Sequence, residues 1–160
     1  MIKTCCGLLE EKNIKIAFIE SASSGYLSSQ FSICKGEGAE ILIGGLICYD
    51  VSVKTSVLGI SKTLINSHTA ESMPVTVALA KAGKKMFRDA DWIIACTGLL
   101  KPGGSATPEK PEGTFFVAIN DGTQIHQFQY YLKGSPLERL NKLSAVVAHD
   151  MINLLNNSYS

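Results

Sequence analysis

The chain has 160 residues, 46% of them hydrophobic, which is enough for one domain with a substantial core. Its 15 basic and 14 acidic residues leave a formal net charge of +1, which argues against a nucleic-acid or membrane-surface partner. No stretch approaches the ~20 apolar residues of a transmembrane helix. The first residues are too acidic for a signal peptide, so we expect a single cytoplasmic domain over residues 1–160.

The cysteines and histidines indicate neither a disulfide framework nor a metal site. The five cysteines are odd in number, and none stands in a C-x-x-C pair. Cys48 and Cys96 lie inside apolar runs, as small core residues do. The three histidines are scattered, with no two at the spacing of metal ligands on one helix. We therefore expect no bound metal.

The first part of the chain predicts a helix, a strand and a second helix. Apolar residues recur at helical spacing over residues 2–12, and residues 15–19 form a short apolar run typical of a buried strand. A second helix is expected over residues 25–34. Its candidate buried positions are Tyr26, Leu27, Phe31 and Ile33.

The middle of the chain predicts one strand and two helices. A continuous apolar run over residues 41–49 is typical of a strand covered on both faces. Gly44 and Gly45 inside this run indicate a bulge or a close backbone approach. A short helical turn is expected over residues 51–58. A longer helix is expected over residues 72–88, because it begins with a serine suited to the N-cap position.

The last part predicts three strands, a long loop and a final helix. Residues 92–96 form another buried apolar run, and residues 114–119 and 124–132 alternate around an Asn-Asp-Gly turn, as in a hairpin. Residues 100–113 lack periodicity, and loops of this length are usually functional or disordered. An amphipathic helix is expected over residues 136–155. Together these elements predict an α/β fold with three layers, α/β/α, and a mixed central sheet.

A hydroxyl-rich stretch follows the first predicted strand directly. Ligands of open α/β sheets bind at the carboxyl ends of the strands, beside free backbone N–H groups at helix starts. Ser21 stands at such a place and is a candidate nucleophile, and Lys54 follows the end of the next strand as a candidate base. If these strands are parallel neighbours of the 92–96 strand, Ser21, Lys54, Thr97 and the 100–113 loop gather at one edge of the sheet.

This set of residues suits an amidohydrolase. Ser21 would attack an amide carbonyl, and Lys54 would take its proton and return it to the leaving amine. A lysine with the ordinary pKa of ~10.4 is only ~0.1% neutral at pH 7, so the mechanism needs burial to lower that pKa. The oxyanion would be held by backbone N–H groups of Ala22, Ser23, Ser24 and Gly25. From spacing alone, helix-capping serines and a solvated lysine explain the same residues.

Three ordered motifs carry a family resemblance. Residues 20–25 read E-S-A-S-S-G, where the family has E-S-C-T-G-G. Tyr49 is followed five residues later by Lys54 and then by L-G-I, where the family has L-G-V. Residues 97–114 read T-G-L-L-K-P-G-G-S-A-T-P-E-K-P-E-G-T, against the family pattern T-G-x-x-G-P-G-G-G-T-P-E-K-P-x-G-T. Over nearly its whole length the chain resembles the CinA carboxy-terminal domain family, the nicotinamide-nucleotide amidohydrolases.

The resemblance implies hydrolysis of the carboxamide of nicotinamide mononucleotide to nicotinate mononucleotide and ammonia. It implies a serine–lysine dyad of Ser21 and Lys54, no metal or organic cofactor, and a small nucleotide as the partner in the pocket. Family members commonly form homo-oligomers, dimers or larger, so the resemblance implies the same here. The residues that the resemblance assigns to the substrate pocket are Tyr49, Thr97, Gly103, Gly104, Lys110 and Arg139.

The chain also departs from the family pattern. Ala22 replaces a cysteine, Ser24 a glycine, and Lys101 a loop glycine. The family's arginine in the last helix is absent from its aligned place; Arg139 lies one residue earlier, a rotation of ~100° about a helix. Lys101 could meet the substrate phosphate instead, or be a solvated loop residue. These departures leave open a catalytically impaired member that acts as a nucleotide-binding or regulatory module, or an amidase for another small amide.

Overall fold

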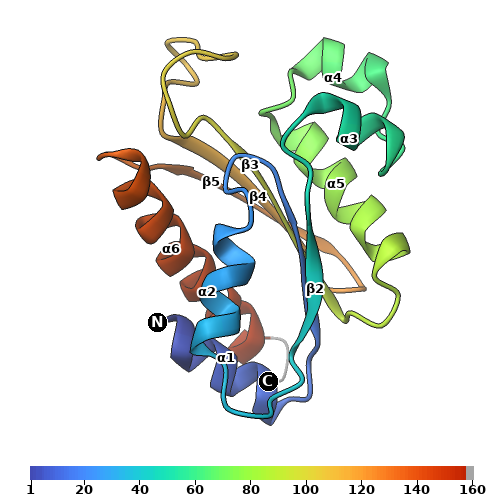
Figure 1. Ribbon diagram of the computed structural model, residues 1–160, viewed down its shortest axis with the longest axis vertical. Coiled ribbons are helices and arrows are strands. Elements are labelled where there is room, and N and C mark those ends of the chain that lie inside the picture. Colours follow the sequence, from blue (N-terminus) through green and yellow to red (C-terminus); the bar gives the residue numbers. More distant parts are fainter. Residues whose placement is uncertain (158–160) are drawn as a thin grey trace.

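The structure is a computed structural model that describes residues 1–157. A five-stranded sheet with strand order β2-β1-β3-β4-β5 forms its centre (Figure 1). β1 pairs in parallel with both β2 and β3, whereas β4 pairs antiparallel with β3 and β5, so the sheet is mixed as predicted. The strands are β1 (Ile16–Glu20), β2 (Leu42–Ile47), β3 (Trp92–Gly98), β4 (Thr114–Asn120) and β5 (Ile125–Tyr131).

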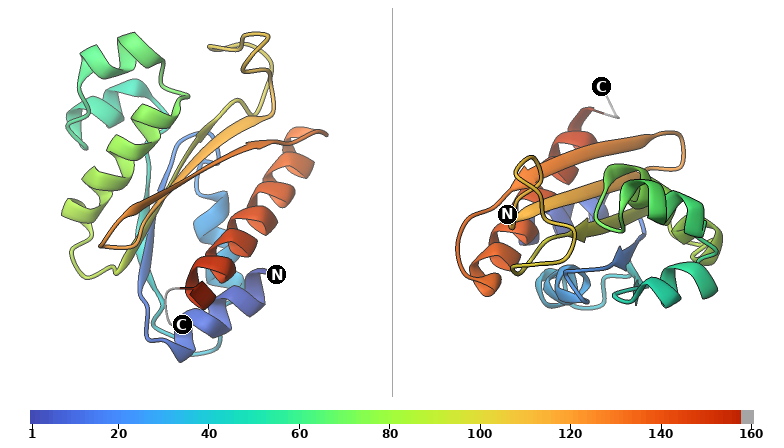
Figure 2. Two further views of the ribbon diagram at one scale, coloured as in Figure 1. Left: turned by 180° about the vertical axis from the view of Figure 1, so that it is seen from behind. Right: turned by 90° about the horizontal axis from the view of Figure 1, so that it is seen from above.

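Helices cover both faces of the sheet, which confirms the predicted three-layer α/β/α architecture. One face carries α1 (Ile2–Glu11), α2 (Tyr26–Cys34) and α6 (Pro136–Asn157), as Figures 1 and 2 show. The other face carries α5 (Met73–Met86), which packs on β1, β3 and β4, with α3 (Val51–Ser56) and α4 (Lys62–His68) beyond its N-terminal end. None of the helices in residues 1–157 is long and apolar enough to cross a membrane.

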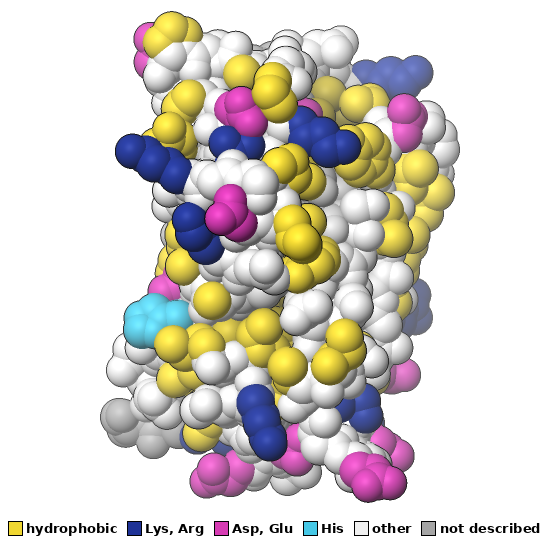
Figure 3. Space-filling model, turned by 60° about the vertical axis from the view of Figure 1, so that its left-hand side comes forward, with side chains coloured by type: hydrophobic (Ala, Val, Ile, Leu, Met, Phe, Trp, Pro, Cys, Tyr) yellow, Lys and Arg dark blue, Asp and Glu magenta, His cyan; other side chains and the backbone are white. Residues whose placement is uncertain are grey.

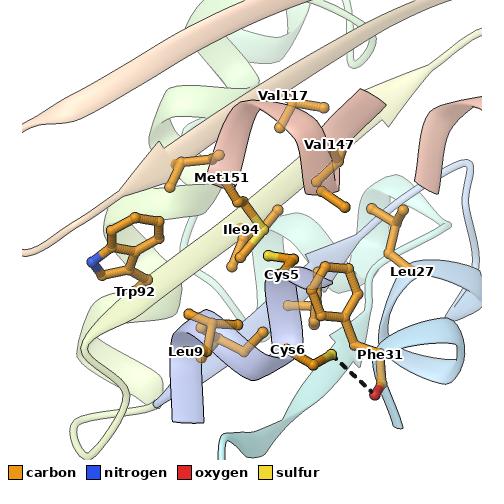
Figure 4. Packing of buried hydrophobic residues seen from close by; sticks show 14 of the residues in the cluster. Cys5, Cys6, Leu9, Leu27, Phe31, Trp92, Ile94, Val117, Val147 and Met151 are labelled. Atoms are coloured by element: carbon orange, nitrogen blue, oxygen red, sulfur yellow. Dashed lines mark hydrogen bonds between the residues drawn. The ribbon is translucent and has the colours of Figure 1, made fainter. Parts of the chain in front are cut away.

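Two hydrophobic clusters hold the layers together. The first lies between the sheet and the α1, α2 and α6 layer, where the side chains of Leu9, Ile94 and Met151 converge (Figure 4). The second lies between the sheet and α5. α5 approaches the sheet closely at Gly83, where an added Cβ would lie 2.7 Å from side-chain atoms of Ile19 and Ile93. The face shown in Figure 3 has basic and acidic side chains interspersed, in keeping with the net charge of +1.

The prediction that the 41–49 strand is covered on both faces is wrong. β2 lies at the edge of the sheet, and its residues alternate between half-buried and exposed, with Ile47 50% exposed. A continuous apolar run looks the same in a central strand and in an edge strand, because the run does not show which other elements cover the strand. The predicted bulge is confirmed: the pairing of Ile16 with Leu42 is followed by that of Ala17 with Gly44.

Two details of the helices also differ from the predictions. Ile33, a candidate buried residue of α2, is 72% exposed, while Leu27 and Phe31 are buried as expected. α4 was not predicted, because its seven residues carry too few apolar positions to establish a helical period. The N-cap at Ser72 is confirmed, since its hydroxyl accepts a hydrogen bond from the backbone N–H of Val75.

We expect Asp121→Asn to destabilise the hairpin between β4 and β5 by about 1–2 kcal/mol at pH 7. The Asp121 carboxylate accepts hydrogen bonds from Thr123, Gln124 and His126, and hydrogen bonding lowers its pKa to about 2 despite the opposing effect of burial. Because the folded pKa lies below the unfolded one, this stabilisation is complete above about pH 4 and is lost as pH falls toward 2.

Urea unfolding of both proteins between pH 2 and 7 measures this effect. The exposed Asp89 serves as the control, since Asp89→Asn should leave the unfolding free energy within about 0.5 kcal/mol of the wild type. A difference between wild type and Asp121→Asn that stays constant down to pH 2 would contradict this role of the carboxylate.

Candidate active site

The three predicted segments meet at one edge of the sheet. β1, β2 and β3 run parallel, so their carboxyl ends point to the same side, where the 100–113 loop and the α3–α4 segment also lie (Figures 1 and 2). A cavity of about 170 Å³ opens there. It is lined by Ser21, Ala22, Tyr49, Glu71, Gly98, Leu99, Leu100, Lys101, Pro102, Gly103 and Gly104.

Ser21 and Lys54 are in direct contact at this edge. The Lys54 Nζ lies 2.9 Å from the Ser21 Oγ, although 33 positions separate the two residues in the chain. Lys54 is only 1% exposed and Ser21 only 8%. The Nζ also lies within hydrogen-bonding distance of the backbone oxygens of Cys48 and Tyr49. The predicted pair of nucleophile and base is therefore brought together in a largely buried place.

The local fold explains this contact. The N–H of Cys48 donates to the carbonyl of Glu20, which ties the end of β2 to the end of β1. The chain then turns into α3, whose N-cap is Asp50 with its carboxylate accepting from the N–H of Ser52. α3 is only six residues long, and Lys54 is its one buried residue, with its Nζ in contact with Ser21.

Burial lowers the pKa of Lys54 below its usual value, against smaller opposing effects of Cys48, Glu71 and Asp50. The surroundings also suit a neutral amine. Two of the three groups around Nζ are carbonyls, which only accept, whereas the Ser21 hydroxyl can donate or accept. An uncharged amine can thus donate both hydrogens to the carbonyls and accept the hydroxyl proton of Ser21.

Glu20 caps the helix after the serine, and the hydrogen bonds of its carboxylate go to α2 rather than to Ser21 or Lys54. Its carboxylate accepts hydrogen bonds from the backbone N–H groups of Leu27 and Ser28, in the first turn of α2. The Ser28 hydroxyl donates to the same carboxylate. The free N–H groups that we expected at the helix start are therefore occupied, and any free donors must come from the turn before the helix.

That turn does contain such donors. Ser24 donates its N–H to the carbonyl of Ser21, and the N–H groups of Ala22 and Ser23 have no hydrogen-bond partner among residues 1–157. Ser24 has φ of 49° and Gly25 has φ of 90°, so the turn passes through the left-handed region at both residues. The side chain of Ser23 is buried beside the Cys96 thiol rather than in the cavity. Backbone N–H groups of Ala22 and Ser23 thus remain available next to Ser21.

Thr97 lies behind the cavity instead of lining it. It is fully buried at the end of β3, and its hydroxyl is 2.8 Å from that of Thr76. The Thr76 hydroxyl donates to the carbonyl of Ser72, so the Thr97 hydroxyl is the donor between the two threonines. Thr97 therefore joins β3 to the start of α5. Any role of Thr97 in the site would be through the position of these two elements.

Lys110 also lies outside the lining of the cavity. Its Nζ donates to the hydroxyls of Thr69 and Ser105 and to the carbonyl of Glu71, at 2.7 to 2.9 Å. Burial lowers the pKa of this lysine, with an opposing effect of Glu71. All three donors of the ammonium are engaged, so Lys110 ties the long loop to the turn between α4 and α5.

Arg139 likewise does not line the cavity. Its guanidinium donates to the carbonyls of Leu100 and Leu132 and forms an ion pair with Glu112. These contacts join α6 to both ends of the long loop and to the end of β5. In this position Arg139 supports the loop that lines the cavity.

Among the remaining predicted residues, Ser24 and Gly25 do not line the cavity, whereas three others do, together with one residue that was not predicted. Tyr49 is 63% exposed at its rim, and Gly103 and Gly104 form part of its wall. The missed residue is Glu71, which follows the unpredicted α4 and carries no motif of its own. Among the described residues, no three His, Cys, Asp or Glu side chains form a group that could hold a metal ion.

Comparison with known sequences identifies the relatives of this chain. A family model described as the CinA C-terminal domain matches residues 1–155. A CinA-like protein of Prochlorococcus marinus is 35% identical over 153 residues, which cover 92% of this chain and 34% of that protein. A CinA-like protein of Fervidobacterium nodosum is 30% identical over 145 residues, 91% of this chain and 35% of that protein. The chain thus spans about a third of the length of these relatives.

Solved structures agree on the fold. The crystal structure of a competence-damaged protein (CinA) superfamily protein from Klebsiella pneumoniae 700603 matches with a TM-score of 0.87, covering 98% of this chain and 96% of that one. At 19% sequence identity this likeness concerns the fold alone. The family model covers nearly the whole chain. The chain belongs to the CinA C-terminal domain family.

Proposed function

We propose that this chain is an amidohydrolase that converts nicotinamide mononucleotide to nicotinate mononucleotide and ammonia. The observation that carries the proposal is the 2.9 Å contact between the buried Lys54 amine and the hydroxyl of Ser21 at the wall of the cavity. A module that only binds its ligand needs no lysine of lowered pKa beside a serine. The choice of substrate rests on the family resemblance.

In the proposed reaction, neutral Lys54 accepts the proton of Ser21 as its Oγ attacks the carboxamide carbon. The new C–O bond gives a tetrahedral intermediate with an oxyanion. Lys54 then returns the proton to the leaving nitrogen, the C–N bond breaks, and ammonia departs. A water molecule, deprotonated by Lys54, attacks the resulting ester, so that nicotinate mononucleotide is released and the Ser21 hydroxyl is restored.

The N–H groups of Ala22 and Ser23 are the proposed oxyanion donors. They belong to the turn that carries the nucleophile, and no group in the described part of the chain competes for them. Each donor placed at the developing oxyanion is worth about 3–4 kcal/mol of transition-state stabilisation in comparable enzymes. Because they are backbone groups, the replacement of the family's cysteine by Ala22 keeps this donor.

The proposal is tested by incubating the purified protein with nicotinamide mononucleotide and measuring ammonia and nicotinate mononucleotide together. Equal amounts of the two products, formed in proportion to protein concentration, are expected. Binding of the nucleotide without product would favour the nucleotide-binding or regulatory module instead, a reading to which the unusual Ser24 and Lys101 point. Release of ammonia only from other carboxamides would contradict the choice of substrate.

A further inference from the structure

The cavity is lined by two residues of opposite charge. Glu71 comes from the turn between α4 and α5, and Lys101 from the first residues of the long loop. They do not form an ion pair with each other, since the ion pairs among residues 1–157 join other residues. Two residues of opposite charge therefore line one small cavity without forming an ion pair with each other.

The glutamate is held in place by its surroundings. One oxygen of the Glu71 carboxylate accepts a hydrogen bond of 2.6 Å from the Ser105 hydroxyl, which in turn accepts from Lys110. The backbone carbonyl of Glu71 also accepts from Lys110. The other carboxylate oxygen, Oε1, has no hydrogen-bond partner in the described part of the chain. Lys54 and Lys110 lie close enough to interact with this carboxylate electrostatically.

The Lys101 side chain, in contrast, is not held by other side chains among residues 1–157. Lys101 is exposed, and its ammonium makes no hydrogen bond or ion pair with the residues that the structure describes. It stands beside Pro102, Gly103 and Gly104 in the wall of the cavity. A long, flexible and unpaired lysine at a cavity rim can follow an anionic group of the ligand that extends toward solvent.

We propose that Glu71 and Lys101 select a dipolar substrate: a positively charged pyridinium carboxamide that also carries a phosphate. This inference rests on the proposed function, which places the carboxamide at Ser21. The pyridinium ring of such a ligand would then lie against the fixed carboxylate of Glu71, and the phosphate would reach Lys101. Free nicotinamide has a neutral ring and no phosphate, so it would gain from neither contact.

The cavity size agrees with this arrangement. Its volume of about 170 Å³ is below the ~300 Å³ of ordinary ligand pockets, so it holds an aromatic ring rather than an entire nucleotide. The ribose and phosphate must then extend past the rim, which is where an exposed cation is useful. Lys101 thereby takes the role for which the sequence offered Arg139, whose guanidinium is engaged elsewhere.

Titration calorimetry with Ser21→Ala protein tests the inference separately from turnover, because the nucleophile is absent. The probes are nicotinamide mononucleotide, nicotinamide riboside, which lacks the phosphate, and nicotinamide, which also lacks the ring charge. Adding Lys101→Gln should weaken binding of the mononucleotide about tenfold and leave the riboside unchanged. Adding Glu71→Gln, which keeps the acceptor for Ser105, should weaken both charged ligands about tenfold and leave nicotinamide unchanged.

Exposed residues outside the cavity and the long loop supply the matched controls: Lys62→Gln and Glu11→Gln should leave all three affinities unchanged. Equal losses for mononucleotide and riboside in Lys101→Gln, or an equal loss for nicotinamide in Glu71→Gln, would overturn the inference. A Ser21→Ala protein that binds none of the three ligands would overturn it as well. If the expected affinities are found but the wild type releases no ammonia, the proposed reaction fails and the dipolar site stands.

Discussion

Replacing Ser21 by alanine is expected to lower ammonia release from nicotinamide mononucleotide at least ~10³-fold, with little change in the affinity for the nucleotide. The reason is that Ser21 lines the cavity and its Oγ is the hydroxyl in contact with the buried Lys54 amine. Removing the nucleophile of a comparable serine hydrolase removes nearly all of its catalysis. Steady-state rates and calorimetric affinity for the same substrate measure the two effects.

The exposed serine Ser32 on α2 provides the control, because Ser32→Ala changes the same atoms outside the site and should retain the wild-type rate. Rapid quenching of the wild-type reaction, followed by mass spectrometry, should detect the ester on a peptide that contains Ser21. An equal rate in Ser21→Ala and wild type would exclude Ser21 as the nucleophile. Slow turnover by Ser21→Ala together with a wild-type unfolding free energy would show that the variant has lost the chemistry and not the fold.

The second large effect concerns the charge on Lys54. We expect kcat/KM to rise with pH, because only the neutral amine accepts the Ser21 proton, and to level off above the pKa of Lys54. Burial lowers that pKa, so the inflection should fall below the ordinary value of 10.5. Lys54→Ala should lower the rate at least ~10³-fold and abolish this rise. The measurement is a pH profile of kcat/KM for both proteins.

The exposed Lys62 gives the control for this profile, since Lys62→Ala should leave both the rate and the inflection unchanged. Lys54→Arg should also remain inactive, because a guanidinium does not lose its proton in this range. A rise of kcat/KM with pH that persists in Lys54→Ala would contradict the assignment of Lys54 as the base.

The same lowered pKa has a consequence for stability. At pH values between the pKa of Lys54 in the folded protein and 10.5, Lys54 carries a proton in the unfolded chain but not in the folded one. Unfolding therefore becomes less favourable as pH rises through this range. The unfolding free energy of the wild type, taken relative to Lys54→Met, should therefore increase with pH up to about 10.5. Taking this difference removes the titration of Cys5 and Cys6, whose pKa values do not depend on Lys54.

Much of the fold followed from local patterns. The short apolar runs predicted β1 and β3, the Asn-Asp-Gly turn predicted the hairpin of β4 and β5, and the serine before the long helix predicted its N-cap. These signals depend on residues close together in the chain. The exposed face of β2 and the exposure of Ile33 were predicted wrongly, since burial depends on which elements pack against a segment.

The sequence alone supplied the family motifs, the two candidate residues Ser21 and Lys54, and the prediction that the long loop belongs to the candidate site. Only the tertiary structure decided that these two side chains touch, that Lys110 and Arg139 support the loop from outside the cavity, and that Glu71 lines it. Local sequence determines the type of each element, whereas contacts across the sheet edge depend on strand order and loop path. For this reason the sequence could predict the types of residue in the candidate site, but not the arrangement of its charged residues.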